Sequence, residues 1–189
     1  RIHWERVAVS GVVVANANLN SAKRIGAVLR SAGFLVTAVC STATQVLRLA
    51  GRNDFGVIVC GWHLADMPAI RLPRYVGNGY EFLYIVKELP PKELEYPSLV
   101  TPLNRDQLAA CVGLLIRVSE GTGLTLQKRM ASSGMEEQEM ILRAKQRLIE
   151  QCNMTEPAAH RFLQTRSMRS RKKLCETAML VFDALNIGF

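Results

Sequence analysis

Short apolar runs alternate with helical patterns over the first 118 residues of the chain. Residues 7–15 are almost continuously apolar, as expected for a strand that is buried on both faces. Residues 21–32 place apolar side chains at helical spacing, and Gly33 marks the end of this helix. Further strands are predicted over residues 34–39, 55–60, 82–86 and 98–100, and further helices over residues 42–50 and 104–118.

This alternation predicts an α/β domain built on a parallel sheet. The length accommodates five strands with five crossover connections. One connection is expected to be irregular, because residues 71–79 contain Pro73, Gly77 and Gly79 and are a poor helix by propensity.

The pattern changes after Val118. Gly121, Gly123 and the cluster Ser132-Ser133-Gly134 are typical of a linker, and no strand pattern follows them. We therefore divide the chain into an α/β domain at residues 1–118, a linker at residues 119–134 and a helical domain at residues 135–189.

The first predicted helix of the helical domain, residues 136–152, has apolar side chains in two rows. The main row runs from Ile141 to Cys152, and a second row beside it contains Leu142 and Ile149. Two interpretations stay open: the second row faces a twin helix in a short coiled coil, or both rows form one wide stripe toward the core.

Two more helices complete a predicted three-helix bundle. Thr155 is expected to cap the second helix, with Glu156 and Pro157 in its first turn. Its inward face is predicted to contain Ala159, Phe162 and Leu163, and its outward face Arg161, Gln164, Thr165 and Met168. Ser170 is expected to cap the third helix, whose apolar stripe contains Leu174, Ala178, Val181 and Leu185.

Charge adds a candidate partner. The chain has 24 Lys and Arg against 16 Asp and Glu, a net charge of +8, of which residues 1–118 carry +5, residues 119–140 carry −2 and residues 141–189 carry +5. The last third is the most basic per residue, so nucleic acid is the first partner class to test and an anionic membrane surface the second.

The sequence gives little support for a membrane span, a metal or cofactor site, or a catalytic site. The longest apolar run, residues 7–17, is interrupted by Ser10 and Asn16, which predicts no membrane span and a cytoplasmic protein. The five cysteines are scattered without a Cys-x-x-Cys pair and the three histidines lack ligand spacing, so neither metal nor cofactor is predicted. No grouping of nucleophile, base and oxyanion donors is visible, and the chain is not expected to be an enzyme.

The first domain, with its βαβαβ start and the pair Thr101-Pro102, resembles the receiver domain of bacterial response regulators, a CheY-like (flavodoxin-like) fold with five parallel strands. The resemblance implies a phosphorylation site with two acids after the first strand, an aspartate after the third and a lysine after the fifth. The matching positions hold Asn16, Ala17, Gly61 and Thr101. Because Mg²⁺ and aspartyl phosphate both need carboxylates, we predict a degenerate receiver without phosphorylation. Nearby Asp66 is interpreted as a turn residue.

The helical domain resembles the ANTAR domain over roughly 45 residues in three helices. Positions that match the pattern of that family are Ala144, Lys145, Leu148, Glu156, Ala159, Arg161, Leu163, Met168 and Ala178. The sequence departs from it at Ile149, where the family has methionine, at His160, where it has an aromatic residue, and at Ser167, where it has alanine.

This resemblance implies binding of RNA hairpins in leader transcripts and transcription antitermination. Phosphate contacts and readout of unpaired bases are expected from Lys145, His160, Arg161, Gln164, Arg166, Arg169, Arg171, Lys172 and Lys173. A solvated basic face is the alternative interpretation of the cluster, and a structural salt bridge is the alternative for Arg166.

The whole chain is similar to the amidase-operon antiterminators, which are controlled by a ligand-sensing protein that sequesters them. By analogy we expect control by protein contacts, with such a regulatory protein or a second copy in a homodimer as partner. Two alternatives remain: a DNA-binding response regulator with a helix-turn-helix output, and a protein-interaction adaptor with an acidic partner.

Overall fold

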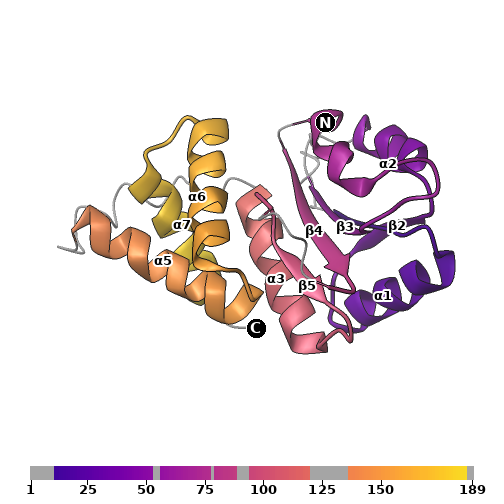
Figure 1. Cartoon of the computed structure of the whole chain (residues 1–189), viewed down its shortest axis with the longest axis horizontal. Helices are drawn as coiled ribbons and strands as arrows, with labels where there is room; N and C mark the ends of the chain where they lie inside the picture. Colours follow the sequence, from indigo (N-terminus) through magenta and orange to yellow (C-terminus); the bar gives the residue numbers. More distant parts are fainter. Residues whose placement is uncertain (1–10, 53–55, 78, 89–93, 120–135, 187–189) are drawn as a thin grey trace, which may run out of the picture.

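The computed structural model describes residues 11–52, 56–77, 79–88, 94–119 and 136–186. The first part of the predicted strand at residues 7–15 and most of the predicted linker lie outside these residues. The chain forms a sheet domain and a helical domain, which lie side by side (Figure 1).

The sheet has five parallel strands in the order β2-β1-β3-β4-β5. This confirms the predicted five-stranded parallel sheet. The strands are β1 (Gly11–Ala15), β2 (Val36–Cys40), β3 (Gly56–Gly61), β4 (Tyr80–Val86) and β5 (Ser98–Val100). Every residue of β3 and β4 is buried, as expected for strands that are covered on both faces.

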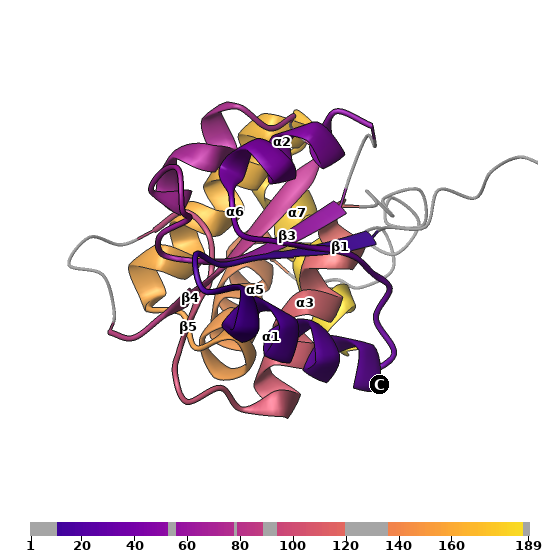
Figure 2. The same ribbon diagram turned by 90° about the vertical axis from the view of Figure 1, so that its right-hand side faces the viewer.

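Helices cover the two faces of the sheet, as Figure 2 shows. On one face lie α1 (Leu19–Ser31) and α3 (Arg105–Ser119), and on the other lie α2 (Ala43–Ala50) and the 3₁₀ helix η1 (Ala69–Arg74). Local signals set the helix ends, since Gly33 takes a positive φ of 91° after α1, and the side chains of Thr42 and Gln45 form a capping box on α2. The short, distorted η1 is the irregular connection that Pro73 predicts.

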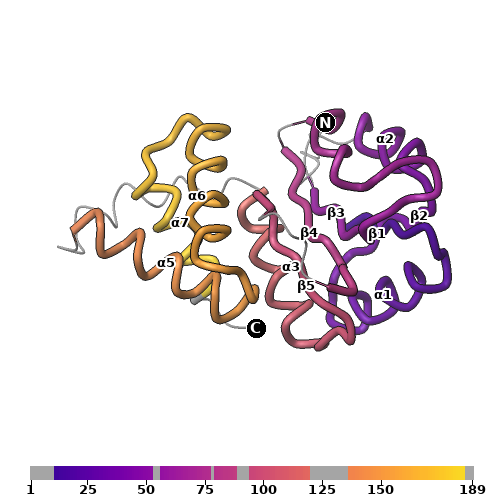
Figure 3. Tube along the Cα trace, in the orientation of Figure 1, coloured from indigo at the N-terminus to yellow at the C-terminus, as the bar shows by residue number. Residues whose placement is uncertain are grey.

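The connection between the parallel strands β4 and β5 lies partly outside the described residues. Its described residues, 87–88 and 94–97, form no helix. After β5 the chain leads on to α3 (Figure 3). Within the connection from β4 to β5, Tyr96 packs its ring against that of Phe82, with the ring centres 5.2 Å apart, and so covers part of β4.

The helical domain consists of α5 (Glu137–Cys152), α6 (Glu156–Ser170) and α7 (Leu174–Asn186). The predicted cap at Ser170 is wrong, because Ser170 is the last residue of α6 and α7 begins at Leu174. Arg171 takes a left-handed conformation with φ of 53°, which ends α6, and the Ser170 hydroxyl donates to the Arg166 carbonyl oxygen at 2.8 Å.

The two domains share one apolar core. A single cluster of buried side chains joins α1, α3 and the sheet to α5, α6 and α7, and α3 contacts both α5 and α7. At this junction the Cys111 Sγ lies 3.8 Å from the Gln151 carbonyl oxygen. Among the described helices, none is long and apolar enough to span a membrane.

Candidate nucleic-acid interface

Helix α6 carries most of the side chains predicted to contact RNA. It begins where the sequence predicts, because the Thr155 hydroxyl accepts a hydrogen bond from the Ala158 N–H at 3.3 Å. Ala159, Phe162 and Leu163 are buried and fix this helix against the core, which confirms its predicted inward face. The remaining side chains of α6 are thereby held in defined directions.

The outward face of α6 and the turn after it are open to solvent. Their exposed residues include Arg161, Gln164, Met168, Arg171 and Lys173. Met168 is 72% exposed, which leaves a large apolar side chain among cationic ones. Lys172 is half-buried, and its carbonyl oxygen accepts a hydrogen bond from Ser167, so the backbone of this turn is held in place.

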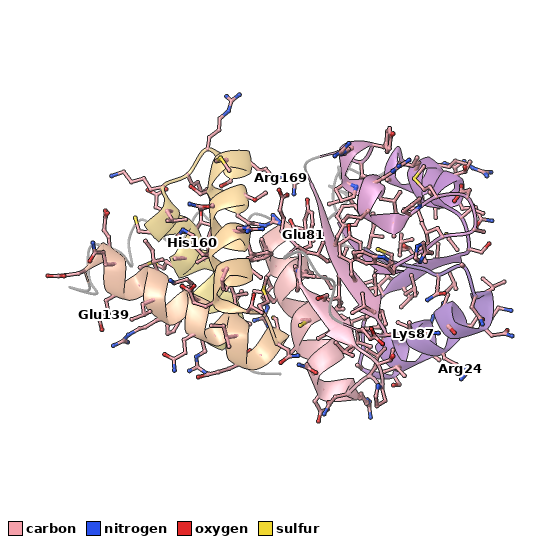
Figure 4. All side chains as sticks on the ribbon, viewed as in Figure 1. Arg24, Glu81, Lys87, Glu139, His160 and Arg169 are labelled. Carbon is pink, nitrogen blue, oxygen red and sulfur yellow. The ribbon has the colours of Figure 1, made fainter. Side chains whose placement is uncertain are left out.

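Lys145, Glu156 and His160 lie together where α5 meets α6. Lys145 forms an ion pair with Glu156, and the hydrogen bond from Lys145, its charge and that of His160 lower the pKa of the Glu156 carboxyl. The Nδ1 atom of half-buried His160 has no hydrogen-bond partner among the described residues. This ring nitrogen is buried, and His160 is labelled in Figure 4.

Arg166 points away from this face, into the contact between the domains. It is 9% exposed and forms an ion pair with Glu81, whose side chain is fully buried on β4. Burial lowers the pKa of Arg166 to about 9, with a further contribution from the nearby charge of Arg169. Its guanidinium carbon also lies 5.3 Å from the centre of the Phe162 ring. Arg166 therefore contacts the sheet domain in this arrangement.

Arg169 contacts the sheet domain as well. Its guanidinium donates a hydrogen bond to the Tyr96 hydroxyl at 2.7 Å and lies 5.9 Å from the centre of the same ring. Figure 4 shows Glu81 and Arg169 at the boundary between the two domains. Sequence reasoning missed Glu81 and Tyr96, although a lone carboxylate in the otherwise uncharged run at residues 80–86 is a signal of a buried partner.

The four positions of the predicted degenerate phosphorylation site lie at the carboxyl ends of three strands. Asn16 follows β1 and Gly61 ends β3, the neighbouring strand, whereas exposed Thr101 follows β5 at the edge. Asn16 covers Gly61 so closely that a Cβ there would lie 2.5 Å from the Asn16 Nδ2. Ala17 is exposed on the loop before α1. The structure brings together Asn16 and Gly61, and leaves Thr101 two strands away from Gly61.

Asp66, the acid nearest to these positions, is engaged by the start of α2. Its carboxylate accepts hydrogen bonds from the Ala43 and Thr44 N–H groups at 2.6 and 3.0 Å, and from the Thr44 hydroxyl at 2.9 Å. These bonds, first of all that from the Thr44 N–H, lower the pKa of Asp66. Asp66 thus acts as a helix cap.

We expect Asp66→Ala to lower the free energy of unfolding at neutral pH by about 1 kcal/mol, the usual loss for a helix cap. The pKa of Asp66 is lowered by folding, so its contribution is present above the ordinary pKa of an aspartate and is lost as the pH falls through the lowered value. Urea unfolding at neutral and acidic pH should therefore show a difference from the parent protein that shrinks in acid. Exposed Glu88→Ala is the control, and an Asp66→Ala difference that grows in acid would contradict this role.

The described residues contain no group of three potential metal ligands. A surface hollow of about 290 Å³ lies between α5 and α7, lined by Arg143, Gln146, Arg147, Glu150 and Phe182. None of the residues predicted to contact RNA lines it.

Comparisons with known proteins identify both domains. The sequence profile of the ANTAR domain matches residues 130–181, starting within the predicted linker. Comparison with curated protein sequences gives no match.

Solved structures share the fold of the first domain. A signal receiver domain of an HD domain-containing protein from Pseudomonas fluorescens Pf-5 has a TM-score of 0.51 at 14% identity, covering 59% of this chain and 98% of its own. A CheY-like receiver domain from Methanospirillum hungatei JF-1 has a TM-score of 0.51 at 14% identity, and the match covers 60% of this chain and 98% of that domain. The response regulator StyR has a TM-score of 0.53 at 17% identity, and the match covers 93% of this chain and 100% of the StyR chain.

These matches agree with the structures of the sheet domain and the helical domain. ANTAR domains bind RNA hairpins, and the matched segment contains α6 with its exposed basic face. The chain therefore carries a receiver-like domain followed by an ANTAR domain.

Proposed function

We propose that this protein is a cytoplasmic transcription antiterminator that binds RNA hairpins in leader transcripts through the outward face of α6 and the turn before α7. The observation that carries the proposal is the exposure of Arg161 and Gln164 on α6 and of Arg171 and Lys173 in the turn that follows it, all within the ANTAR domain. Guanidinium and ammonium groups bind phosphates, and Gln164 and His160 offer hydrogen bonds to unpaired bases. Arg166 and Arg169 are left out of this face because they contact the receiver-like domain.

We further propose that the receiver-like domain works without phosphorylation. Asn16, Ala17, Gly61 and Thr101 supply neither carboxylate nor lysine, and Mg²⁺ prefers carboxylate oxygens. The tight contact of Asn16 with Gly61 leaves little room for an acceptor side chain. The carboxylate of Asp66 is occupied by the amides of α2.

Protein contacts are then the remaining means of control. Leu142 and Ile149 lie seven residues apart on α5 and are 60% and 36% exposed, which supports pairing of α5 with its twin in a homodimer. A ligand-sensing partner that sequesters the protein, as in the amidase-operon antiterminators, is a second use of such a surface.

The test is transcription in vitro across a leader that carries tandem hairpins and a terminator. We expect the parent protein to raise readthrough several-fold, because a bound hairpin excludes the terminator, and acetyl phosphate to change nothing. Arg161→Ala should abolish most of the effect, since loss of one specific contact to a base or phosphate costs roughly 1–3 kcal/mol of binding free energy. Arg24→Ala, at an exposed position of α1, is the matched control (Arg24 is labelled in Figure 4). Readthrough that is equal for Arg161→Ala and the parent protein would contradict the proposed face, and stimulation by acetyl phosphate would contradict the lack of phosphorylation.

A further inference from the structure

The receiver-like domain carries an exposed basic surface, which we call the α2–η1 surface. Arg48 lies at the end of α2 and Arg52 just beyond it, while Arg71 and Arg74 belong to η1 and Tyr75 follows them. All five side chains are exposed, and Tyr75 is 63% exposed. Helix α2 contacts η1, and buried residues of both belong to one core cluster, so the two elements lie on the same face of the sheet.

Acidic side chains do not offset this charge in the described part of the surface. Helices α2 and η1 contain no acid, and the loop between β3 and η1 contains only Asp66. The oxygens of Asp66 already accept hydrogen bonds from the first turn of α2. The α2–η1 surface therefore attracts polyanions.

Charge alone does not select a partner, because cations are also favoured at the ends of helices. The exposed aromatic ring of Tyr75 and the 45% exposed side chain of Ile70 distinguish this surface from a solvated basic face. Aromatic rings beside arginines are platforms on which unpaired bases stack while the guanidinium groups hold the phosphates.

The α2–η1 surface lies at the same edge of the molecule as the turn between α6 and α7. Both η1 and this turn lie near the upper edge in Figures 1 and 2. Tyr96, which binds Arg169 near the end of α6, shares a buried cluster with Leu72 of η1 and with Val76 just beyond it. The docked arrangement thus places two cationic surfaces along one edge.

We propose that the α2–η1 surface is a second RNA-binding site, which takes single-stranded RNA next to the hairpin held by α6. This inference rests on the proposed function. The phosphates of the strand contact the arginines, and an unpaired base stacks on Tyr75. The receiver-like domain then contributes to RNA binding directly, in a role that needs no phosphoryl group.

The test compares two fluorescent RNAs, one hairpin alone and the same hairpin with single-stranded uridine extensions at both ends, each titrated with the full chain. For the extended RNA we expect Arg71→Ala/Arg74→Ala to weaken binding about tenfold or more, and to reduce the slope of log affinity against log salt by roughly 1.4, two single-strand phosphate contacts. Tyr75→Ala should weaken it about fivefold or more. Binding of the hairpin alone should stay within about twofold of the parent protein for both variants. Arg24→Ala/Arg30→Ala on α1 removes the same charge from exposed positions elsewhere and is the control.

The outcomes separate this inference from the proposed function. If Arg161→Ala weakens the binding of both RNAs while the Arg71, Arg74 and Tyr75 variants bind both RNAs normally, the hairpin site on α6 stands and the proposed α2–η1 site is wrong. Equal weakening by the α1 control would also overturn it, since net charge alone would then explain the loss. If the parent protein binds neither RNA, or Arg161→Ala binds both normally, the proposed function itself fails and this inference with it.

Discussion

Replacing Glu81 with glutamine is expected to lower the free energy of unfolding by about 3–5 kcal/mol, the usual result of removing one partner of a buried ion pair. Glu81 is fully buried on β4, and its partner Arg166 is 9% exposed on α6. Without the carboxylate, the guanidinium keeps its cost of burial and loses its counter-charge. Urea unfolding at neutral pH measures the change.

Two variants make this test specific. Glu95→Gln removes an exposed carboxylate next to Tyr96, the partner of Arg169, and should change stability by less than about 0.5 kcal/mol. Glu81→Leu combined with Arg166→Met replaces the pair by apolar side chains and should recover most of the loss, because both buried charges disappear. A Glu81→Gln variant as stable as Glu95→Gln would show that the pair does not hold the domains together.

Leu148→Ala is expected to destabilise the whole chain by about 2–5 kcal/mol. Leu148 is fully buried on α5, in the cluster that continues through α3 into the sheet domain. Because both domains share this core, the loss should appear equally in tryptophan fluorescence, which reports on Trp4 and Trp62 of residues 1–118, and in helical ellipticity. Leu142→Ala, at a position 60% exposed on the same helix, is the matched control and should have little effect.

Coincident unfolding curves are the expected result for Leu148→Ala. The contrary result is an ellipticity transition that moves to lower urea while the fluorescence transition stays in place. That outcome would mean that the receiver-like domain unfolds independently and that the shared core contributes little.

Much of the fold could be predicted because its signals are local. The alternation of apolar runs with helical spacing, Gly33 after α1 and Thr155 before α6 each specify a structure over a few neighbouring residues. The prediction for Ser170 was wrong for a related reason. A serine hydroxyl can cap the start of a helix or donate a hydrogen bond to a carbonyl oxygen near the end of one. Here the left-handed conformation of Arg171 ends α6, and the Ser170 hydroxyl donates to a carbonyl oxygen of that helix.

The contact between the domains could not be predicted in the same way. The partners of Arg166 and Arg169 depend on how the ANTAR domain docks. The sequence sets Arg166 apart, because a structural salt bridge is one interpretation of it, but it offers no partner for Arg166 and does not separate Arg169 from Arg161 and Arg171. Only the direction of each side chain on α6 separates the arginines that contact Glu81 and Tyr96 from those that face solvent.

The most direct test of RNA binding by the α6 face is a titration of the full chain against a hairpin RNA with duplex DNA as competitor at physiological salt. We predict saturable binding that resists the duplex, is weakened about tenfold or more in Arg161→Ala, and is unchanged in Arg24→Ala. Equal competition by duplex DNA would favour a DNA-binding regulator, and no binding to RNA would favour a protein-interaction adaptor. Either result would contradict specific recognition of RNA hairpins by the α6 face.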